Sequence, residues 1–391
     1  MDIDNNGDRP LAYIEKIASL VPIENADFLE IASIRGWNVV VKKGQYVTGD
    51  VIIYAEIDSV LPPWPTYIKD GLEKNKFRIK TIKLRGQISQ GYCIPISVFS
   101  EHPTRRLELQ KTEENNPVLA KLVDQDSGEC IELRLGTDVT LLLDIGKYLN
   151  PHEEVDEQAF GNKAHNHVNR ALFPSEFLHK TNQERIQNMG HLLQSFADME
   201  FEVTEKLDGS SVTAYYYINP QFKAADGFGL CSRNFRLSGD EPEPLATAAW
   251  GIASALGLRE RLEKYGKHLA LQGEICGDKF QGNPYQLRPC RWFIFDVYLI
   301  DDQRYATPSE REQILKDLNL ADHAVPTVEK KRTLSGMKVA DIVGMADGMS
   351  LLNPRARREG LVFKSVTLTE RGRTVSFKAV SNVWLLKNTA K

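Results

Sequence analysis

A lysine followed two positions later by an aspartate is the part of this sequence best suited to covalent chemistry. Lys206 and Asp208 lie in the run EKLDG at positions 205–209, between two strand-like segments, residues 201–204 and 212–218. A lysine amine is a nucleophile only when it is unprotonated, and its ordinary pKa is about 10.4. A divalent metal ion or a second lysine nearby lowers that pKa. A solvated β-turn, in which Asp-Gly is common, is the other interpretation of the same run.

Further motifs follow this run in a fixed order. They are Ser232-Arg233-Asn234, Gly273-Glu274-Ile275, Phe293-Ile294-Phe295-Asp296, Glu359-Gly360-Leu361-Val362-Phe363-Lys364 and Phe377-Lys378. Taken singly, each has an ordinary explanation, such as a glutamate on a solvated edge or a phenylalanine in the core. Taken together, their order and approximate spacing resemble the nucleotidyl-transfer motifs that polynucleotide ligases share with RNA capping enzymes. The resemblance extends from about residue 173 to the end of the chain.

The resemblance implies a reaction and a set of site residues. Lys206 would attack the α-phosphate of ATP and carry AMP as a lysyl phosphoramide. The carboxylates of Asp208, Glu274 and Glu359 would surround Mg²⁺ or Mn²⁺, often through its waters, and would act in catalysis with Lys206 and Lys378. The implied contacts to the nucleotide are Glu205, Lys206, Arg233 and Glu274, with Phe295 stacked on adenine and Lys364 and Lys378 on the triphosphate. The implied contacts to the sugar or strand end are Ser232, Arg233 and Asn234.

The last motif departs from the pattern of many ligases, which have two lysines separated by one residue. Here Lys378 is preceded by Ser376 and followed by Ala379 and Val380, so the second lysine is missing. Lys378 remains the candidate at this position. What replaces its partner stays open, with Lys387 and Lys364 as the two alternatives.

Two features indicate a branch of the superfamily. Only residues 379–391 follow the last motif, too few for the C-terminal OB domain that DNA ligases and capping enzymes usually have. The motif at 232–234 and the ending resemble the RNA ligase 2 branch. Together with a β-rich N-terminal region, they resemble the ATP-dependent RNA ligases that carry an OB domain at the N-terminus.

The N-terminal region predicts a small β-barrel. Short apolar segments are separated by turn residues such as Gly36, Gly44 and Gly49, a spacing typical of barrels. The polar stretch 101–127 predicts an insertion or loop. The predicted strands are residues 31–34, 37–41, 46–47, 51–57, 77–84, 92–96, 130–135 and 139–143.

The predicted fold class is multidomain α+β. An OB-type β-barrel for nucleic-acid binding would occupy residues 1–150, and a polar, acidic linker residues 151–172. A nucleotidyltransferase domain (ATP-grasp-like, DNA/RNA ligase catalytic) of antiparallel sheets and helices would occupy residues 173–391. Thr181 and Glu184 have the spacing of a capping box, which predicts a helix after Thr181.

A basic segment in the N-terminal region is a candidate nucleic-acid contact. Arg78 and Lys80 alternate with apolar residues, and Lys83 and Arg85 continue the alternation after a shift. A strand with this pattern would present its cations on one exposed face, as OB folds do toward a nucleic-acid backbone. A merely solvated strand face is the alternative.

Composition limits the class of protein. Of the 391 residues, 42% are hydrophobic and 26% charged, as in ordinary globular proteins, and the net charge of −4 means that phosphate contacts depend on local patches. No stretch approaches the roughly 20 apolar residues of a membrane span, and the first ten residues are polar. We therefore expect a cytoplasmic monomer without membrane contact or an obligate protein partner. Its five scattered cysteines would be reduced and mostly buried (Cys93, Cys130, Cys231, Cys276, Cys290).

The predicted function is ATP-dependent joining of 3′-hydroxyl and 5′-phosphate ends in RNA or an RNA/DNA hybrid. The resemblance favours nicks with RNA on the 3′-hydroxyl side. Two alternatives remain. One is a nucleic-acid-binding protein with an inactive nucleotidyltransferase domain, which the intact Lys206, Asp208, Glu274 and Glu359 disfavour. The other is a capping guanylyltransferase that forms lysyl-GMP, since Phe295 alone does not select the nucleotide.

Overall fold

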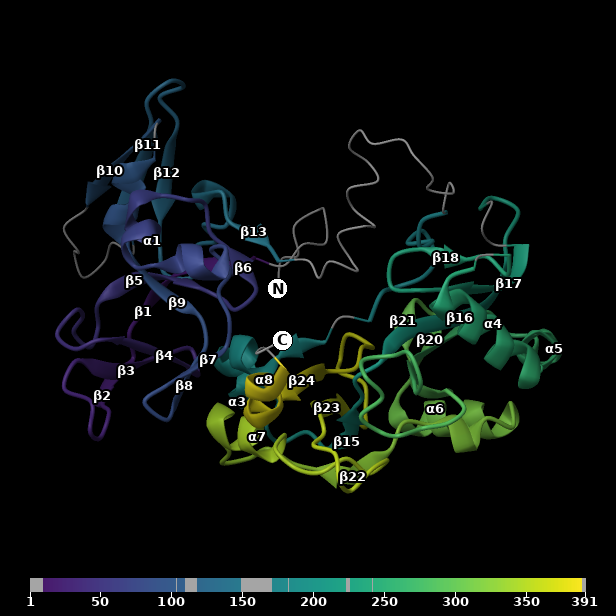
Figure 1. Ribbon diagram of the computed structural model, residues 1–391. Coiled ribbons are helices and arrows are strands. Elements are labelled where there is room, and N and C mark those ends of the chain that lie inside the picture. Colours follow the sequence, from purple (N-terminus) through teal and green to yellow (C-terminus); the bar gives the residue numbers. More distant parts are fainter. Residues whose placement is uncertain are drawn as a thin grey trace. The chain divides into compact units, whose positions relative to one another are not determined.

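The computed structural model divides the chain into two compact units (Figure 1). Unit 1 comprises Met1–Val155 and Leu386–Lys391, and unit 2 comprises Asp156–Leu385. The structure describes residues 10–102, 104–109, 118–148, 171–181, 183–222, 226–240 and 242–388. The predicted linker at 151–172 lies outside the described residues except for its last two positions.

Two three-stranded antiparallel sheets form the centre of unit 1. One has the order β1-β5-β9, and the other has the order β2-β3-β4. Buried and exposed residues alternate along β3 and β4, as expected for strands with one face on a core. Their tight hairpin uses Gly36, whose φ of 96° suits glycine. The strands are β1 (Ala12–Lys16), β5 (Val51–Ala55), β9 (Tyr92–Pro95), β2 (Ser19–Pro22), β3 (Leu29–Ile34) and β4 (Trp37–Lys42).

Shorter elements complete unit 1. Three strands form a further sheet, β10 (Arg105–Leu109), β11 (Ala120–Asp124) and β12 (Cys130–Leu133). Two strand pairs are β6 (Ser59–Val60) with β13 (Gly146–Lys147), and β7 (Ile82–Leu84) with β8 (Gln87–Ser89). The helical segments are α1 (Pro65–Lys69), η1 (Leu72–Asn75), η2 (Ile96–Glu101) and η3 (Leu141–Leu143).

Several predicted elements of unit 1 are wrong. Residues 46–47 form no strand, and the supposed loop at 101–127 contains β10 and β11, with residues 103 and 110–117 outside the described part. Residues 139–143 contain η3 instead of a strand. The reason lies in Thr140, whose Oγ1 accepts hydrogen bonds from the backbone N–H groups of Leu11 (2.8 Å) and Ala12 (3.1 Å). This side chain takes the place of a ladder hydrogen bond.

The predicted basic strand is also wrong. Only residues 82–84 of the segment form a strand, and Arg85 lies in the following turn with a φ of 46°. The Arg78 guanidinium is 2.7 Å from Asp58 Oδ1 and stacks on Tyr148, 3.4 Å from the ring centroid. Arg78, Lys80, Lys83 and Arg85 therefore do not share one strand face. The alternation of charges could not reveal these tertiary partners.

Unit 2 contains two larger sheets. The first has the order β14-β24-β23-β15-β22, and the second has the order β18-β17-β16-β19-β20-β21. The first consists of β14 (Glu184–Arg185), β15 (Phe201–Lys206), β22 (Thr327–Arg332), β23 (Gly360–Ser365) and β24 (Ser376–Val380). The second consists of β16 (Ser210–Ile218), β17 (Asp226–Cys231), β18 (Arg236–Leu237), β19 (Leu269–Cys276), β20 (Arg291–Leu299) and β21 (Arg304–Tyr305).

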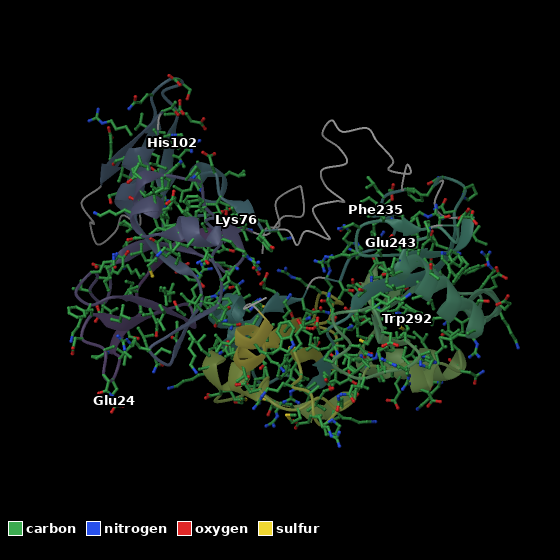
Figure 2. All side chains as sticks on the ribbon, viewed as in Figure 1. Glu24, Lys76, His102, Phe235, Glu243 and Trp292 are labelled. Carbon is green, nitrogen blue, oxygen red and sulfur yellow. The ribbon has the colours of Figure 1, made fainter. Side chains whose placement is uncertain are left out.

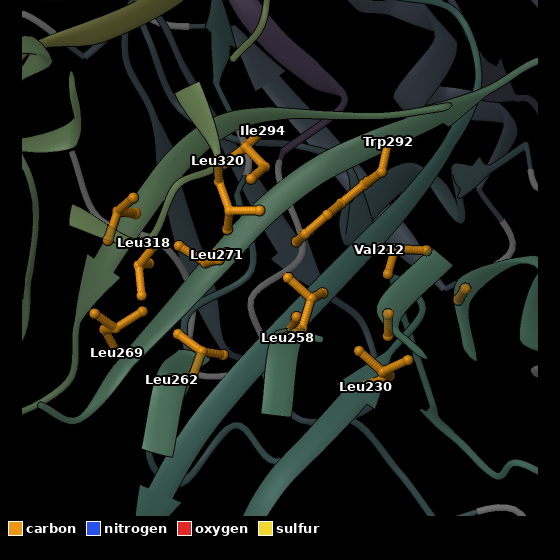
Figure 3. Packing of buried hydrophobic residues seen from close by; sticks show 14 of the residues in the cluster. Val212, Leu230, Leu258, Leu262, Leu269, Leu271, Trp292, Ile294, Leu318 and Leu320 are labelled. Atoms are coloured by element: carbon orange, nitrogen blue, oxygen red, sulfur yellow. The ribbon is translucent and has the colours of Figure 1, made fainter. Parts of the chain in front are cut away.

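Helices cover one face of the second sheet. Leu258 and Leu262 from α5 pack with Leu271 from β19 and with Trp292 and Ile294 from β20 (Figure 3). Burying one such side chain contributes about 1.5–3 kcal/mol to stability, so these contacts hold the helices against the second sheet. The helical segments of unit 2 are η5 (Ile186–Leu192), α3 (Leu193–Phe196), α4 (Pro244–Ala255), α5 (Leu258–Tyr265), α6 (Pro308–Asp317), η6 (Ala321–His323) and α7 (Val339–Met345). A last helix, α8 (Asn382–Asn388), begins in unit 2 and ends in residues assigned to unit 1.

The helix predicted directly after Thr181 is wrong. The chain forms β14 and then η5 there. The Thr181 hydroxyl hydrogen-bonds to Gln272 of β19, and Glu184 Oε1 accepts from Asn188 Nδ2 at 2.8 Å. These partners replace the capping contacts that the spacing suggested. Among the described residues, no helix has both the length and the apolar character that crossing a membrane requires.

Candidate active site

Lys206 is the last residue of β15 and forms an ion pair with a neighbouring strand. Its Cα lies opposite that of Gly360 in the antiparallel β15–β23 register, which places Glu359 next to it. Lys206 Nζ is 2.6 Å from Glu359 Oε1. The two side chains are 27% and 12% exposed, so the pair is partly open to a ligand. Strand pairing thus brings together two motifs that are far apart in the sequence.

The turn after Lys206 carries the chain from the first sheet to the second. Gly209 packs so tightly that an added Cβ would lie 2.3 Å from the carbonyl oxygen of Ile275. This close approach requires glycine and brings Asp208 toward β19, on which Glu274 lies. The Asp208 N–H donates a 2.7 Å hydrogen bond to the hydroxyl oxygen of Tyr285. Sequence reasoning missed Tyr285, because no motif marks the loop that supplies it.

Three carboxylates influence the pKa of the Lys206 amine. Burial alone would lower the pKa of Lys206, but Glu359, followed by Glu274 and Asp208, raises it above its ordinary value. Burial raises the pKa of Glu274 to about 8, with Lys206 opposing the shift and Glu359 and Asp208 adding to it. Lys206 is therefore a protonated ammonium in this arrangement. It can act as a nucleophile only after added positive charge displaces its proton.

The donor set suits a hydrated divalent cation. Asp208, Glu274 and Glu359 offer only carboxylate oxygens, which Mg²⁺ and Mn²⁺ prefer. Across the described residues, no group of three or more histidine, cysteine, aspartate or glutamate side chains is arranged to hold a metal ion directly. The carboxylates consequently fit a metal ion that keeps its waters between itself and the protein.

The carboxylate of Glu205 is buried and takes no part in the Lys206–Glu359 ion pair. Its Oε2 accepts a 2.7 Å hydrogen bond from the Leu351 N–H. Its Oε1 is buried and has no hydrogen-bond partner in the ranges that the structure describes. Burial raises the pKa of Glu205, against hydrogen bonds from Ser350 and Leu351 and the charge of Arg358. The site thus contains a buried acceptor that a bound ligand can satisfy.

Lys364 lies in a buried ion pair that joins the two sheets. Its ammonium contacts Asp296 of β20, and the two side chains are 6% and 5% exposed. Burial lowers the pKa of Lys364, and Asp296 opposes the shift only in part. A second buried pair links Arg311 of α6 to Glu202 of β15, with Arg311 Nη2 2.9 Å from both carboxylate oxygens. The structure places Lys364 between the two sheets, and its expected contact with the triphosphate stays a prediction.

Phe295 lies at the edge of a small apolar cluster. Phe295 packs half-buried against this cluster, whose buried members are Leu207, Cys276, Tyr285, Phe293 and Val325. Its backbone carbonyl accepts a 3.0 Å hydrogen bond from Arg311 Nη1. One side of the ring therefore packs against the cluster, and the ring has a partly exposed surface beside the turn that contains Leu207.

The predicted strand-contacting motif 232–234 forms the turn between β17 and β18. Ser232 Oγ accepts from the N–H of Phe235, labelled in Figure 2, at 3.1 Å. Asn234 Oδ1 accepts from Lys180 Nζ at 3.0 Å, while the Arg233 side chain is exposed. Ser232 and Asn234 thus shape the turn, and Arg233 is the member that reaches solvent.

Lys378 lies on β24 beside two strands. Its Cα pairs with that of Val362 on β23 and, in a parallel register, with that of Arg185 on β14. Lys387, one alternative to the missing second lysine, is exposed on α8, and the other, Lys364, is buried. Strand pairing therefore offers Arg185, which the sequence did not suggest, as the cation next to Lys378.

Comparison with known proteins gives consistent matches over both units. The RNA ligase family model matches residues 199–380, and an OB-fold domain model matches residues 11–96. Structures of the Naegleria gruberi RNA ligase align over nearly the whole chain. A variant solved with ATP and Mn is 33% identical, with a TM-score of 0.74 and coverage of 97% of this chain and 100% of that one. A variant with AMP and Mn is also 33% identical, with a TM-score of 0.75 and coverage of 98% and 100%.

The same ligase with pyrophosphate gives a TM-score of 0.74 at 33% identity, covering 98% of this chain and 100% of that one. A search of curated proteins finds no significant match. The predicted fold class, an N-terminal OB domain followed by a ligase catalytic domain, is confirmed by the model and structure matches. The enzyme class predicted from the motif order is confirmed as well. Sequence and structure together show that the chain belongs to the RNA ligase family.

Proposed function

We propose that Lys206 is the nucleophile of this ATP-dependent RNA ligase, and that the enzyme joins a 3′-hydroxyl to a 5′-phosphate through lysyl-AMP. The observation that carries the proposal is the Lys206 amine, 2.6 Å from Glu359 and under the influence of Glu274 and Asp208. The Naegleria ligase was solved with ATP, with AMP and with pyrophosphate, which are the substrate and the two fragments of such an adenylyl transfer.

The spacing of residues replaced in the Naegleria structures supports these roles. Among its variants are single replacements of two different lysines, an aspartate, two different glutamates and an arginine, and one of these lysines is replaced in the variant solved with ATP and Mn. That lysine and the aspartate lie two positions apart, as Lys206 and Asp208 do. The two glutamates are separated by as many residues as Glu274 and Glu359, and the arginine precedes its lysine by the interval between Arg185 and Lys206. We therefore add Arg185, beside Lys378, to the proposed phosphate contacts.

The reaction takes three balanced steps. First, the Lys206 ammonium loses a proton to water, its Nζ forms a bond to the α-phosphorus of ATP, the bond from that phosphorus to the pyrophosphate oxygen breaks, and Nζ releases a second proton. Second, an oxygen of the RNA 5′-phosphate takes the adenylyl group, and the lysine is released. Third, the 3′-hydroxyl oxygen attacks the activated 5′-phosphate and loses its proton, and AMP leaves.

The residues around Lys206 control its proton and its position. Glu359 orients the amine and holds its proton until nucleotide and metal arrive. A bound divalent metal supplies the positive charge that lowers the amine pKa and neutralises the phosphoryl oxygens. Asp208, Glu274 and Glu359 would hold that ion through its waters. Tyr285 and Gly209 keep Asp208 at the distance from β19 that this arrangement needs.

Glu205 and Phe295 are proposed to recognise adenine. In its ionised form Glu205 accepts hydrogen bonds at the buried Oε1, which matches the exocyclic amino group of adenine and opposes the O6 acceptor of guanine. The partly exposed ring of Phe295 offers a stacking surface. This acceptor favours ATP over the GTP of a capping enzyme. Arg233, with its exposed side chain, remains a proposed phosphate or strand contact.

The proposed substrate is RNA, or an RNA/DNA hybrid, with a nick that has RNA on the 3′-hydroxyl side. We further propose that the enzyme is a monomer and that it is cytoplasmic, and the thiol content supports the cytoplasmic location. All five cysteines are free, and Cys93, Cys231 and Cys276 are buried, as expected in a reducing compartment. Arg78, Lys80, Lys83 and Arg85 remain candidate RNA contacts of unit 1, although Arg78 is already paired with Asp58.

The deciding experiment follows transfer of label to the protein. Purified enzyme is incubated with α-labelled ATP or GTP and with Mg²⁺ or Mn²⁺, denatured and separated on a gel, beside Lys206→Ala. We expect label from ATP that is absent from the variant. Label only from GTP would favour a capping guanylyltransferase, and no label from either nucleotide would favour a nucleic-acid-binding protein with an inactive domain.

A further inference from the structure

A short hairpin-like loop leads directly into Glu359. Between α7 and β23, the N–H of Ser350 donates to the carbonyl of Ala356 at 2.8 Å, and the N–H of Arg358 donates to that of Gly348 at 3.1 Å. We call residues 348–358 the arginine loop, because it contains Arg355, Arg357 and Arg358. Its end is adjacent to the Lys206–Glu359 ion pair.

Contacts at both sides hold the arginine loop in place. The Arg358 guanidinium donates to the carbonyls of Met345 (2.7 Å) and Ala346 (3.1 Å) at the end of α7. Asn353 Nδ2 donates to the carbonyl of Pro284 at 2.9 Å, in the loop that also carries Tyr285. The Leu351 N–H binds Glu205. The loop is therefore a fixed part of the rim of the site.

Arg355 and Arg357 differ from Arg288 and Arg291, whose guanidinium groups have polar partners. Both are exposed, and no carboxylate in the described ranges forms an ion pair or hydrogen bond with either guanidinium. By contrast, Arg288 is 3.1 Å from Asp278, and Arg291 donates to the carbonyl of Asp322 at 2.9 Å. The arginine loop thus presents two uncompensated positive charges on a chain whose net charge is −4.

The direction of the backbone places one of these charges on the active-site side. Alternate side chains of an extended segment point to opposite sides. Arg357 forms a bridge with Met349, so the segment is extended there. Arg358 faces the carbonyls at the end of α7, whereas Glu359 faces Lys206. Arg357, two residues before Glu359, therefore lies on the same side as Glu359.

We propose that Arg355 and Arg357 bind the phosphodiester backbone of the RNA strand beside the break, which rests on the proposed RNA ligase function. Guanidinium groups match phosphate oxygens in geometry and charge. The nucleotide is assigned to residues around Lys206 and Glu205, inside the rim, while these two arginines lie on the exposed loop. They hold the strand so that its end reaches the adenylylated lysine.

The test measures RNA binding apart from chemistry. A nicked RNA duplex with 3′-hydroxyl and 5′-phosphate ends is titrated in the absence of ATP and metal, at several salt concentrations, by fluorescence anisotropy. The variants are Arg355→Ala, Arg357→Ala and the double change. Affinity falls as the salt concentration rises, and each lost phosphate contact reduces the magnitude of the slope of log affinity against log salt by about 0.7–0.9. We expect that decrease for each arginine, equally for different RNA sequences.

Two controls isolate the effect. Arg371→Ala removes an exposed arginine at the other end of β23 and should leave the slope unchanged. Arg355→Lys and Arg357→Lys keep the charge and should restore most of the slope. In the alanine variants, AMP transfer to RNA should fall more than self-adenylylation measured without RNA.

An unchanged affinity and slope in the double variant would overturn the proposal. An equal loss of self-adenylylation and RNA joining would also overturn it, because the arginines would then act on ATP. Failure of the unaltered enzyme to self-adenylylate would instead sink the proposed ligase function. The binding titration needs no ATP and would still decide the role of the two arginines.

Discussion

Two lysine–carboxylate pairs in unit 2 have the same chemical groups and opposite electrostatics. Lys206 and Glu359 are 27% and 12% exposed, and Glu359, Glu274 and Asp208 outweigh burial and raise the pKa of Lys206. Lys364 and Asp296 are 6% and 5% exposed, and burial lowers the pKa of Lys364. Surplus carboxylates and an opening to solvent suit the first pair to chemistry. Isolation suits the second to holding two sheets together.

The largest expected effect comes from removing the exposed lysine. Lys206→Met should reduce self-adenylylation to background, because no other nucleophile replaces the amine. Its melting temperature should stay near that of the unaltered enzyme, since the pair is partly solvated and methionine keeps most of the length of the lysine side chain. Label transfer and thermal unfolding measure the two quantities. A variant that retains adenylylation would show that the roles of the two lysines are wrongly assigned.

Breaking the buried Lys364–Asp296 pair should instead reduce the stability of the protein. Asp296→Leu leaves the Lys364 ammonium buried without its partner, which costs about 3–5 kcal/mol of unfolding free energy. The double change Lys364→Met with Asp296→Leu should recover most of that loss, because an apolar pair replaces the ion pair. Urea unfolding measures both. As control, Glu312→Ala removes the exposed pair with Lys316 and should change stability by less than about 1 kcal/mol. A single variant no less stable than this control would contradict the assignment.

Gly209 tests the positioning of the exposed pair. In Gly209→Ala the added Cβ would lie 2.3 Å from the Ile275 carbonyl, so the turn must move away from β19. A displacement of about 1 Å can reduce a rate about 10²-fold, and we expect a loss of that order in self-adenylylation. Gly344→Ala, where nothing lies within 4 Å of the added Cβ, is the matched control. Equal rates in both variants would argue against tight packing of the turn.

Titration of Glu274 gives the smallest effect. Its pKa is raised to about 8, so the carboxyl is neutral below that pH and gains its negative charge as the pH rises through it. Mn²⁺ affinity should therefore increase with pH up to about 8, by at most about tenfold per unit for one proton released. Glu274→Gln should flatten this dependence. A steeper profile in the variant than in the unaltered enzyme would contradict the role given to Glu274.

The sequence predicted the chemistry better than the contacts. The run around Lys206 and the strands on either side of it could be recognised, because a short motif between apolar segments is a local feature. The burial of Lys364 could not, since it depends on β20, which supplies Asp296. The predictions of a helix after Thr181 and of a basic strand containing Arg78 were wrong for the same reason. Their partners, Gln272 and Asp58, are tertiary neighbours that no local pattern indicates.

The turn at Asp208 and Gly209 divides the charges around the nucleophile between two sheets. Lys206 ends β15 and Glu359 directly precedes β23, both strands of the first sheet, whereas Glu274 lies on β19 of the second. The field that acts on the amine therefore depends on how far one sheet slides against the other. The Lys364–Asp296 pair joins these sheets, and Arg311 of α6 contacts both of them, through Glu202 of β15 and the carbonyl of Phe295 on β20. Loosening either contact would change the reactivity of Lys206 from a distance.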